Sequence, residues 1–110
     1  MKWAFSTNAF TNGKYSIFDA VRWIANTGYQ GVEILMDKPL VWPFDFRNEE
    51  INRLKRMLKE LSLGISGLNG FTCSGYWIEK SKKPPGQKFG PCFCDYEEEF
   101  REMRIKYTKK

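Results

Sequence analysis

Two carboxylates in one short apolar stretch are the residues of this sequence that most clearly raise a question of chemistry. Glu33 stands between Val32 and Ile34, and Asp37 follows four positions later, in GVEILMD. An ionised carboxylate is costly to remove from water unless donors, a cation or a metal compensate it. Such a group can act as an acid or base, but it can also brace a fold through hydrogen bonds. Both roles stay open for Glu33, and bracing is favoured.

The absence of histidine narrows the chemistry further. None of the 110 residues is histidine, which excludes Ser-His-Asp and Cys-His catalysis and the H-E-x-x-H zinc helix. Cys73, Cys92 and Cys94 are an odd number of cysteines, so a closed disulfide framework is not expected. They could offer three thiolates to zinc, but structural zinc sites usually have four ligands with C-x2-C spacing. Free thiols are therefore the favoured interpretation, and no metal ligand is assigned.

Composition is typical of one small globular domain. Hydrophobic residues make up 42% of the chain and charged residues 28%. The net charge of +5 comes from basic residues interleaved with acids, which favours an ordinary solvated surface over a phosphate-binding one. The sequence has no secretory signal and no apolar run near membrane-spanning length. We therefore expect a cytoplasmic protein with no membrane partner.

Three short segments with the composition of β-strands position the carboxylates. They cover residues 2–7, 31–36 and 65–69. Helical patterns separate them, so the predicted order is β-α-β-α-β with a parallel sheet. Side chains alternate along a strand, so Val32, Ile34 and Met36 should face the helices. Glu33 and Asp37 should then lie on the opposite face, with Asp37 nearer the carboxyl end of the strand.

The two helices between these strands have recognisable ends. Ser16 should open the first helix with Asp19 as its capping-box partner, and Gly28 stands where that helix should stop. Asn48 should cap the second helix, and Gly64 should end it. The apolar stripes that should be buried are Ile17, Ala20, Val21, Ile24 and Ala25, and Ile51, Leu54, Leu58 and Leu61.

The remainder of the chain contains one long irregular segment and one more helical pattern. The irregular segment covers residues 70–94, and a third helix should begin near Asp95. Its apolar positions are Tyr96, Phe100, Met103 and Tyr107. The helical pattern has no stop signal before Lys110. We interpret residues 1–110 as a single partial domain, cut within or after the third helix.

The connections that follow the strands are long, and those that precede the strands are short. Ligands of parallel α/β folds bind in the long connections, at the carboxyl ends of the strands. Many aromatic residues lie there, namely Phe10, Trp42, Phe44, Phe46, Phe71, Tyr76, Trp77, Phe89 and Phe93. Rings among polar groups can bind a sugar or a nucleobase, although each ring could equally pack its loop. The predicted substrate-binding residues are Phe10, Trp42, Trp77, Asp37 and Asn69.

The order of these segments resembles the start of xylose isomerase-like TIM barrels. The stretches that carry the resemblance are KWAFSTNAF, NTGYQGVEI, KELSLG and ISGLN, and they fall within about residues 1–72. The most characteristic piece runs from Gly28 to Ile34. The superfamily contains sugar phosphate isomerases and epimerases, and endonucleases that cut DNA at abasic sites. The resemblance implies an α/β fold that is the parallel β-α-β-α-β start of a TIM (β/α)8 barrel.

The function that the resemblance implies is isomerisation or epimerisation of a sugar or sugar phosphate with a divalent metal, Mn, Mg or Zn. The family's main metal ligands and acid/base residues come from later strands. We therefore expect the 110 residues alone to be inactive, to bind no metal well, and to self-associate or join the remainder of a barrel. Glu33 matches a recurrent family acid, whereas Asn69 stands where several members have histidine.

Two other functions remain open. An abasic-site endonuclease-like barrel agrees with the net positive charge, but the histidine-rich metal sites of such enzymes have no counterpart here. A small basic module that binds single-stranded nucleic acid is the second, because lysines lie among aromatic residues. These residues are Tyr76, Trp77, Lys80, Lys82, Lys83, Lys88 and Phe89. The β-α-β-α-β pattern explains more of the chain, so a nucleic-acid partner is not favoured.

Overall fold

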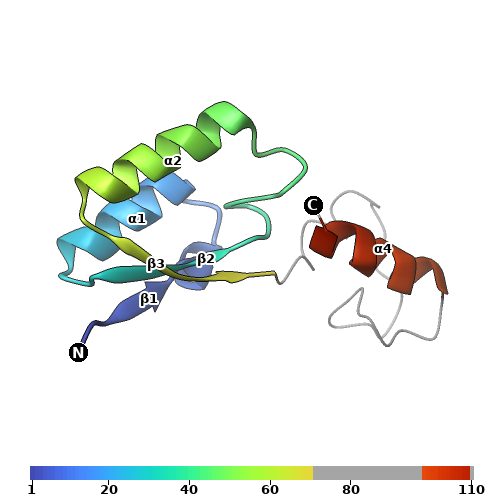
Figure 1. Ribbon diagram of the computed structural model, residues 1–110, viewed down its shortest axis with the longest axis horizontal. Helices are drawn as coiled ribbons and strands as arrows, with labels where there is room; N and C mark the ends of the chain where they lie inside the picture. Colours follow the sequence, from blue (N-terminus) through green and yellow to red (C-terminus); the bar gives the residue numbers. More distant parts are fainter. Residues whose placement is uncertain (71–97, 110) are drawn as a thin grey trace.

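The computed structural model describes residues 1–70 and 98–109. In these residues a three-stranded parallel sheet and three helices make a mixed α/β fold, shown in Figure 1. The elements are β1 (Ala4–Ser6), the 3-10 helix η1 (Thr7–Phe10), α1 (Ile17–Asn26), β2 (Gly31–Leu35), α2 (Asn48–Glu60), β3 (Gly64–Asn69) and α4 (Glu98–Lys109). The predicted β-α-β-α-β order and the parallel sheet are confirmed.

The sheet has the order β1-β2-β3, so β2 is the central strand. Ser6 of β1 is the register partner of Glu33, and both strand pairs are parallel. The pairing of β2 with β3 contains a β-bulge, because Val32 pairs with Ile65 while Glu33 pairs with Gly67. Ser66 is therefore an extra residue in β3. Its presence shifts the alternation of side chains in the second half of that strand.

Helices α1 and α2 lie on the same face of the sheet (Figure 1). Val32 and Ile34 are buried in the core with the apolar stripes of the two helices, and Met36 packs against this core. The predicted helix-facing set of β2 is therefore confirmed. The buried helix positions are Ile17, Ala20, Val21, Ile24, Leu54 and Leu58. The stripe positions Ala25, Ile51 and Leu61 are only partly buried.

The N-terminus of α1 has the predicted capping box. The Ser16 hydroxyl accepts a hydrogen bond from the backbone N–H of Asp19 at 3.2 Å. The Asp19 carboxylate in turn accepts one from the backbone N–H of Ser16 at 3.1 Å and one from its hydroxyl at 2.6 Å. After the helix, Gly28 has a φ of +91°, a conformation that side-chain-bearing residues rarely adopt. Both predicted ends of this helix are confirmed.

The prediction that Asn48 caps α2 is wrong by one residue. Asn48 is the first residue of the helix, and Arg47 is the N-cap. The backbone N–H of Arg47 donates to the Glu50 side chain at 3.0 Å, so an acid in the first turn supplies the contact that caps the end.

The prediction that Gly64 ends α2 is also wrong, because Gly64 is the first residue of β3. The helix instead ends in a Schellman arrangement. The N–H of Ser62 donates to the Lys59 carbonyl at 3.1 Å, and the N–H of Leu63 donates to the Leu58 carbonyl at 2.9 Å. Ser62 takes the left-handed position, with a φ of 54°, that glycine usually holds.

The first strand-to-helix connection contains more structure than the predicted turn. Residues Thr7–Phe10 form η1, and the Ser6 hydroxyl accepts the hydrogen bond that caps it. The predicted turn signal at Asn12-Gly13 is confirmed, because the Asn12 side chain accepts from the Lys14 N–H at 3.0 Å and Gly13 has a φ of +77°.

The third predicted helix is present as α4, although its predicted start near Asp95 and the residue Tyr96 lie outside the described residues. Most of the long segment 70–94 also lies outside them. Phe100 and Met103 of α4 pack against Trp42, and the Arg104 side chain donates to the Gly70 carbonyl at 2.8 Å. Across residues 1–70 and 98–109, none of the helices combines the length and apolar character needed to cross a membrane.

Candidate functional site

Glu33 lies on the face of the sheet that α1 and α2 do not cover. It belongs to the central strand, and its side chain is partly buried. The hydroxyl of Ser6, its register partner on β1, donates a hydrogen bond to Glu33 Oε1 at 2.6 Å. Short hydrogen bonds to an ionised oxygen are among the stronger ones in proteins. The carboxylate of Glu33, in an otherwise apolar strand, is therefore hydrogen-bonded by a residue of the neighbouring strand β1.

A residue of β3 approaches the same oxygen. Asn69 Nδ2 lies 3.5 Å from Glu33 Oε1, at the outer limit of a hydrogen bond. Gly67 is the register partner of Glu33 on β3, and a Cβ atom at that position would lie 3.9 Å from Glu33 Cγ. Because Gly67 has no side chain, the Glu33 side chain meets little bulk on that side. Three strands thus contribute to the surroundings of one carboxylate.

The two oxygens of Glu33 have different surroundings. Oε1 receives both the Ser6 hydroxyl and the Asn69 amide. Within residues 1–70 and 98–109, no hydrogen bond or ion pair reaches Oε2. A carboxylate with one oxygen hydrogen-bonded and the other without a partner can accept a proton or receive a donor from a ligand.

The described residues do not fit a divalent metal by themselves. Across them, no group of three or more Cys, Asp or Glu side chains is arranged to hold a metal ion. Ser6 and Asn69 add only neutral oxygens to the single carboxylate of Glu33. Hard divalent cations are usually held by several oxygen ligands, of which carboxylates are the most effective. The surroundings of Glu33 therefore suit proton transfer or hydrogen bonding better than metal binding.

Asp37, predicted to lie nearer the carboxyl end of the strand than Glu33, stands two residues after the end of β2. It is 1% exposed, and its carboxylate accepts a hydrogen bond from the N–H of Lys38 at 2.8 Å. Its backbone carbonyl accepts from the N–H groups of Leu40 and Val41 at 3.1 and 3.0 Å. No hydrogen bond among the described residues joins Asp37 to Glu33. These contacts organise the connection after β2, which also contains the cis peptide bond between Lys38 and Pro39.

The two predicted substrate-binding rings in the described residues both make packing contacts. Phe10 is 9% exposed and belongs to the core. Trp42 is 3% exposed and contacts Phe44, with the ring centroids 5.6 Å apart. The Lys38 ammonium lies 5.8 Å from the Trp42 ring and also pairs with Asp45 at 3.2 Å. The alternative that these rings pack their loops therefore agrees with their observed contacts.

The other residues considered in the sequence lie outside the described part of the chain. They are Trp77, the aromatic residues and lysines of the nucleic-acid interpretation, and Cys73, Cys92 and Cys94. Ser6 is the site residue that sequence reasoning missed. It stands in a predicted strand, so its type and element were visible, but its register against Glu33 was not.

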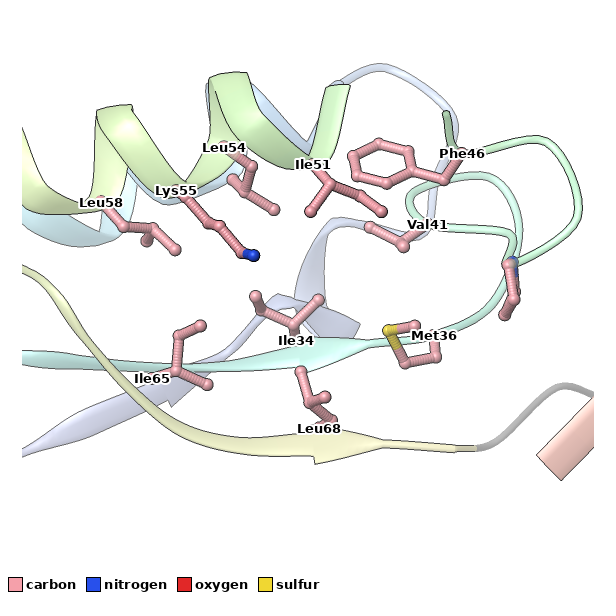
Figure 2. A pocket seen from close by; sticks show the side chains of 11 residues that line it. Ile34, Met36, Val41, Phe46, Ile51, Leu54, Lys55, Leu58, Ile65 and Leu68 are labelled. Atoms are coloured by element: carbon pink, nitrogen blue, oxygen red, sulfur yellow. The ribbon is translucent and has the colours of Figure 1, made fainter. Parts of the chain in front are cut away.

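An apolar groove lies on the other face of the sheet, between α2 and the strands β2 and β3 (Figure 2). Its volume is about 260 Å³, and among the described residues that line it Lys55 is the charged one. Figure 2 shows the Lys55 amine pointing from α2 toward Ile34. On the β3 side Ile65 is 53% exposed and Leu68 is 64% exposed. The described residues that line the groove are apolar apart from Lys55, so they offer no set of polar groups that would orient a reacting ligand.

Comparison of the chain with family models, with curated proteins and with solved structures finds no match. The function must therefore be inferred from the arrangement of the side chains.

Proposed function

We propose that the chain is the N-terminal part of a TIM barrel that isomerises or epimerises a sugar or sugar phosphate in the cytoplasm. The observation that supports this proposal is the placement of Glu33, Ser6 and Asn69. Ser6 and Asn69 are the last residues of β1 and β3, and Glu33 lies between them on the helix-free face. In a barrel that face is the interior, and the carboxyl ends of the strands form the ligand site.

The chemistry proposed for Glu33 is a proton transfer between adjacent carbons. Oε2 takes the proton from the carbon next to the sugar carbonyl, and the electron pair of the broken C–H bond moves toward the carbonyl oxygen. In an isomerisation the enediolate regains the proton at the neighbouring carbon, and the hydroxyl proton moves from the one oxygen to the other. In an epimerisation an acid from elsewhere in the barrel protonates the same carbon on its opposite face. No electron donor or acceptor is consumed. The hydroxyl of Ser6 and the amide of Asn69 contact Oε1 and so leave Oε2 as the oxygen that takes the proton.

The metal that the resemblance implies has its proposed ligands elsewhere in the barrel. The described residues contain no group of three or more carboxylates or thiols that could hold the ion, and Glu33 alone is too few. When bound, a divalent metal would polarise the carbonyl and hydroxyl of the sugar. The contribution proposed for this chain is confined to Glu33 and the two groups that contact it.

The test measures the exchange of sugar hydrogen with solvent deuterium. The 110-residue chain and the product of the complete reading frame are each incubated in D2O with Mn²⁺ or Mg²⁺ and a panel of sugars and sugar phosphates. Proton NMR then reports loss of the signal at the carbon next to the carbonyl. We expect exchange with the complete product and none with the 110 residues alone. Glu33→Gln should lower the exchange rate about 100-fold or more, the usual range for a lost acid/base group.

Glu60→Gln is the matched control, because Glu60 is an exposed glutamate at the end of α2. It should leave exchange unchanged. If the complete product exchanges no sugar hydrogen, the proposed function is wrong. If Glu33→Gln exchanges as fast as the wild type, Glu33 is only a bracing residue. Rapid exchange by the 110 residues alone would show that they form a working active site without the rest of a barrel.

A further inference from the structure

The hydrogen bond from Ser6 to Glu33 has a direction that the surrounding backbone determines. A serine hydroxyl has one proton to donate and lone pairs that can accept. The N–H of Asn8 points at Ser6 Oγ from 3.2 Å, as part of the cap of η1. A lone pair of Ser6 Oγ is therefore already used, and the hydroxyl proton is directed to Glu33 Oε1 at 2.6 Å.

The backbone holds both ends of this pair. Ser6 and Glu33 are register partners in the parallel pairing of β1 with β2, so their Cα positions are set by the sheet. Ser6 is also the N-cap of η1, so its φ of −87° and ψ of 134° are set by the start of that helix. The Asn69 amide lies 3.5 Å from the same oxygen and adds a second, weaker contact. Neither contact involves Oε2.

We infer that Ser6 is a positioning residue that holds Oε1 of Glu33 and so presents Oε2 as the oxygen that meets the substrate. The part of this inference that concerns a reaction at Oε2 rests on the proposed function. The holding of Oε1 by Ser6 does not depend on it. During the transfer Oε2 gains the proton of the broken C–H bond, and in an isomerisation it later returns that proton to the neighbouring carbon. The Ser6 hydroxyl proton stays on Ser6 throughout, because its role is to fix the plane of the carboxylate.

The first measurement reads this hydrogen bond without any sugar. The infrared spectrum of the wild type minus that of Glu33→Gln isolates the carboxylate bands of Glu33. A strong hydrogen bond to one oxygen makes the two C–O bonds unequal and separates the antisymmetric and symmetric bands. Ser6→Ala should bring these bands closer together, and Ser6→Thr, which keeps a hydroxyl, should restore the wild-type separation. Ser66→Ala is the matched control, because Ser66 is an exposed serine of the same sheet.

The second measurement uses the deuterium exchange assay on the complete reading-frame product. Ser6→Ala should lower kcat about tenfold with little change in KM, because a misplaced base affects the transition state more than sugar binding. Ser6→Thr should recover most of that loss. Should Ser6→Ala fail to give native amide NMR spectra, Ser6→Cys replaces it, since a thiol of similar size is only a weak donor.

The outcomes separate this inference from the proposed function. Glu33 bands that are identical in the wild type and Ser6→Ala would overturn the inference, whatever the enzyme does. A kcat that Ser6→Ala leaves unchanged would also overturn it. Band changes with Thr rescue would support the holding of Oε1 even if no sugar exchanged, and that last result would count against the proposed function alone.

Discussion

The hydroxyl of Thr7 accepts a hydrogen bond from the backbone N–H of Leu35 at 2.8 Å, and Thr7 is completely buried. This contact joins the first residue of η1 to the last residue of β2. The N–H of Leu35 lies at the carboxyl end of the central strand. A side chain there provides the hydrogen-bond partner that a buried backbone donor requires. It also holds η1 next to the strand that carries Glu33.

Replacing Thr7 by valine tests the importance of this contact for stability. Valine has nearly the same shape but no hydroxyl, so the buried Leu35 N–H would lose its partner. We expect Thr7→Val to lower the free energy of unfolding by about 1–3 kcal/mol, the usual cost of an unsatisfied buried donor. Urea unfolding followed by tryptophan fluorescence measures the change. Thr7→Ser keeps the hydroxyl and should be less destabilising than Thr7→Val, and the reverse order would contradict the role of the hydrogen bond.

The capping box of α1 should contribute to stability in a pH-dependent way. The Ser16 side chain and then the Ser16 backbone N–H hold the pKa of Asp19 below its ordinary value of 3.8, with smaller contributions from Arg22 and Arg53. A pKa that is lower in the folded protein stabilises the fold above the unfolded value. That stabilisation is lost as the pH falls through the folded pKa. The stabilisation is therefore lost over pH values below 3.8.

We expect Ser16→Ala to weaken this pH dependence, because alanine keeps the backbone N–H that holds Asp19 but loses the hydroxyl. The midpoint of thermal unfolding, followed by circular dichroism, should be lower in Ser16→Ala than in the wild type at neutral pH. The difference between the two proteins should shrink as the pH falls well below 3.8, because protonated Asp19 no longer accepts the hydrogen bonds. Asp19→Asn should behave in the same way. A difference that stays constant down to the most acidic folded sample would contradict this explanation.

The end of α2 offers a stabilising substitution. Ser62 has a φ of 54°, which costs energy for any residue with a Cβ atom. We expect Ser62→Gly to raise the free energy of unfolding by about 0.5–1 kcal/mol in urea unfolding. Gly64→Ala is the comparison, because an added Cβ would lie 3.5 Å from the Gln30 carbonyl oxygen, an ordinary contact. It should change stability by less than about 0.5 kcal/mol. Destabilisation by Ser62→Gly would mean that the serine side chain is needed at this end.

We propose that the groove beside β3 promotes self-association of the 110-residue chain. Ile65 and Leu68 expose apolar surface, and β3 is an edge strand of the described sheet. Sedimentation velocity at increasing concentration should show oligomers of the wild type, and Leu68→Lys should shift them toward monomers. Asn52→Lys adds the same charge at an exposed position of α2 and should not. A wild type that stays monomeric at every concentration would contradict this proposal.

The parts of the fold that were predictable from the sequence depend on local signals. Ser16 and Asp19 cap α1 through contacts within one turn, and the spacing of apolar residues identified the buried faces of both long helices. The end of α2 could not be predicted in this way. A nearby glycine, Gly64, offered an apparent stop, whereas the chain places Ser62 in the left-handed conformation. Local propensity favoured glycine there, but the packing of Leu63 into the core sets where the helix ends.

The candidate site was predictable only in part for a related reason. Alternation along one strand was enough to place Glu33 on the face opposite the helices. Its partners depend on the register between strands, which one sequence does not specify, so the contact with Ser6 was not foreseen. The rings of Phe10 and Trp42 are chemically suited to both packing and ligand binding. Only their buried contacts with other side chains distinguish these uses.

The extra residue in β3 has a consequence for insertions and deletions in this strand. Ile65 and Leu68 share the helix side of the sheet although they are three residues apart, because Ser66 has no partner on β2. A deletion of Ser66 would leave a regular strand with every remaining side chain on its present side. A one-residue insertion after Leu68 would instead carry Asn69 to the side of the helices, away from Glu33. In lineages that vary in length here, position 66 is where a residue can be lost without exchanging the two faces.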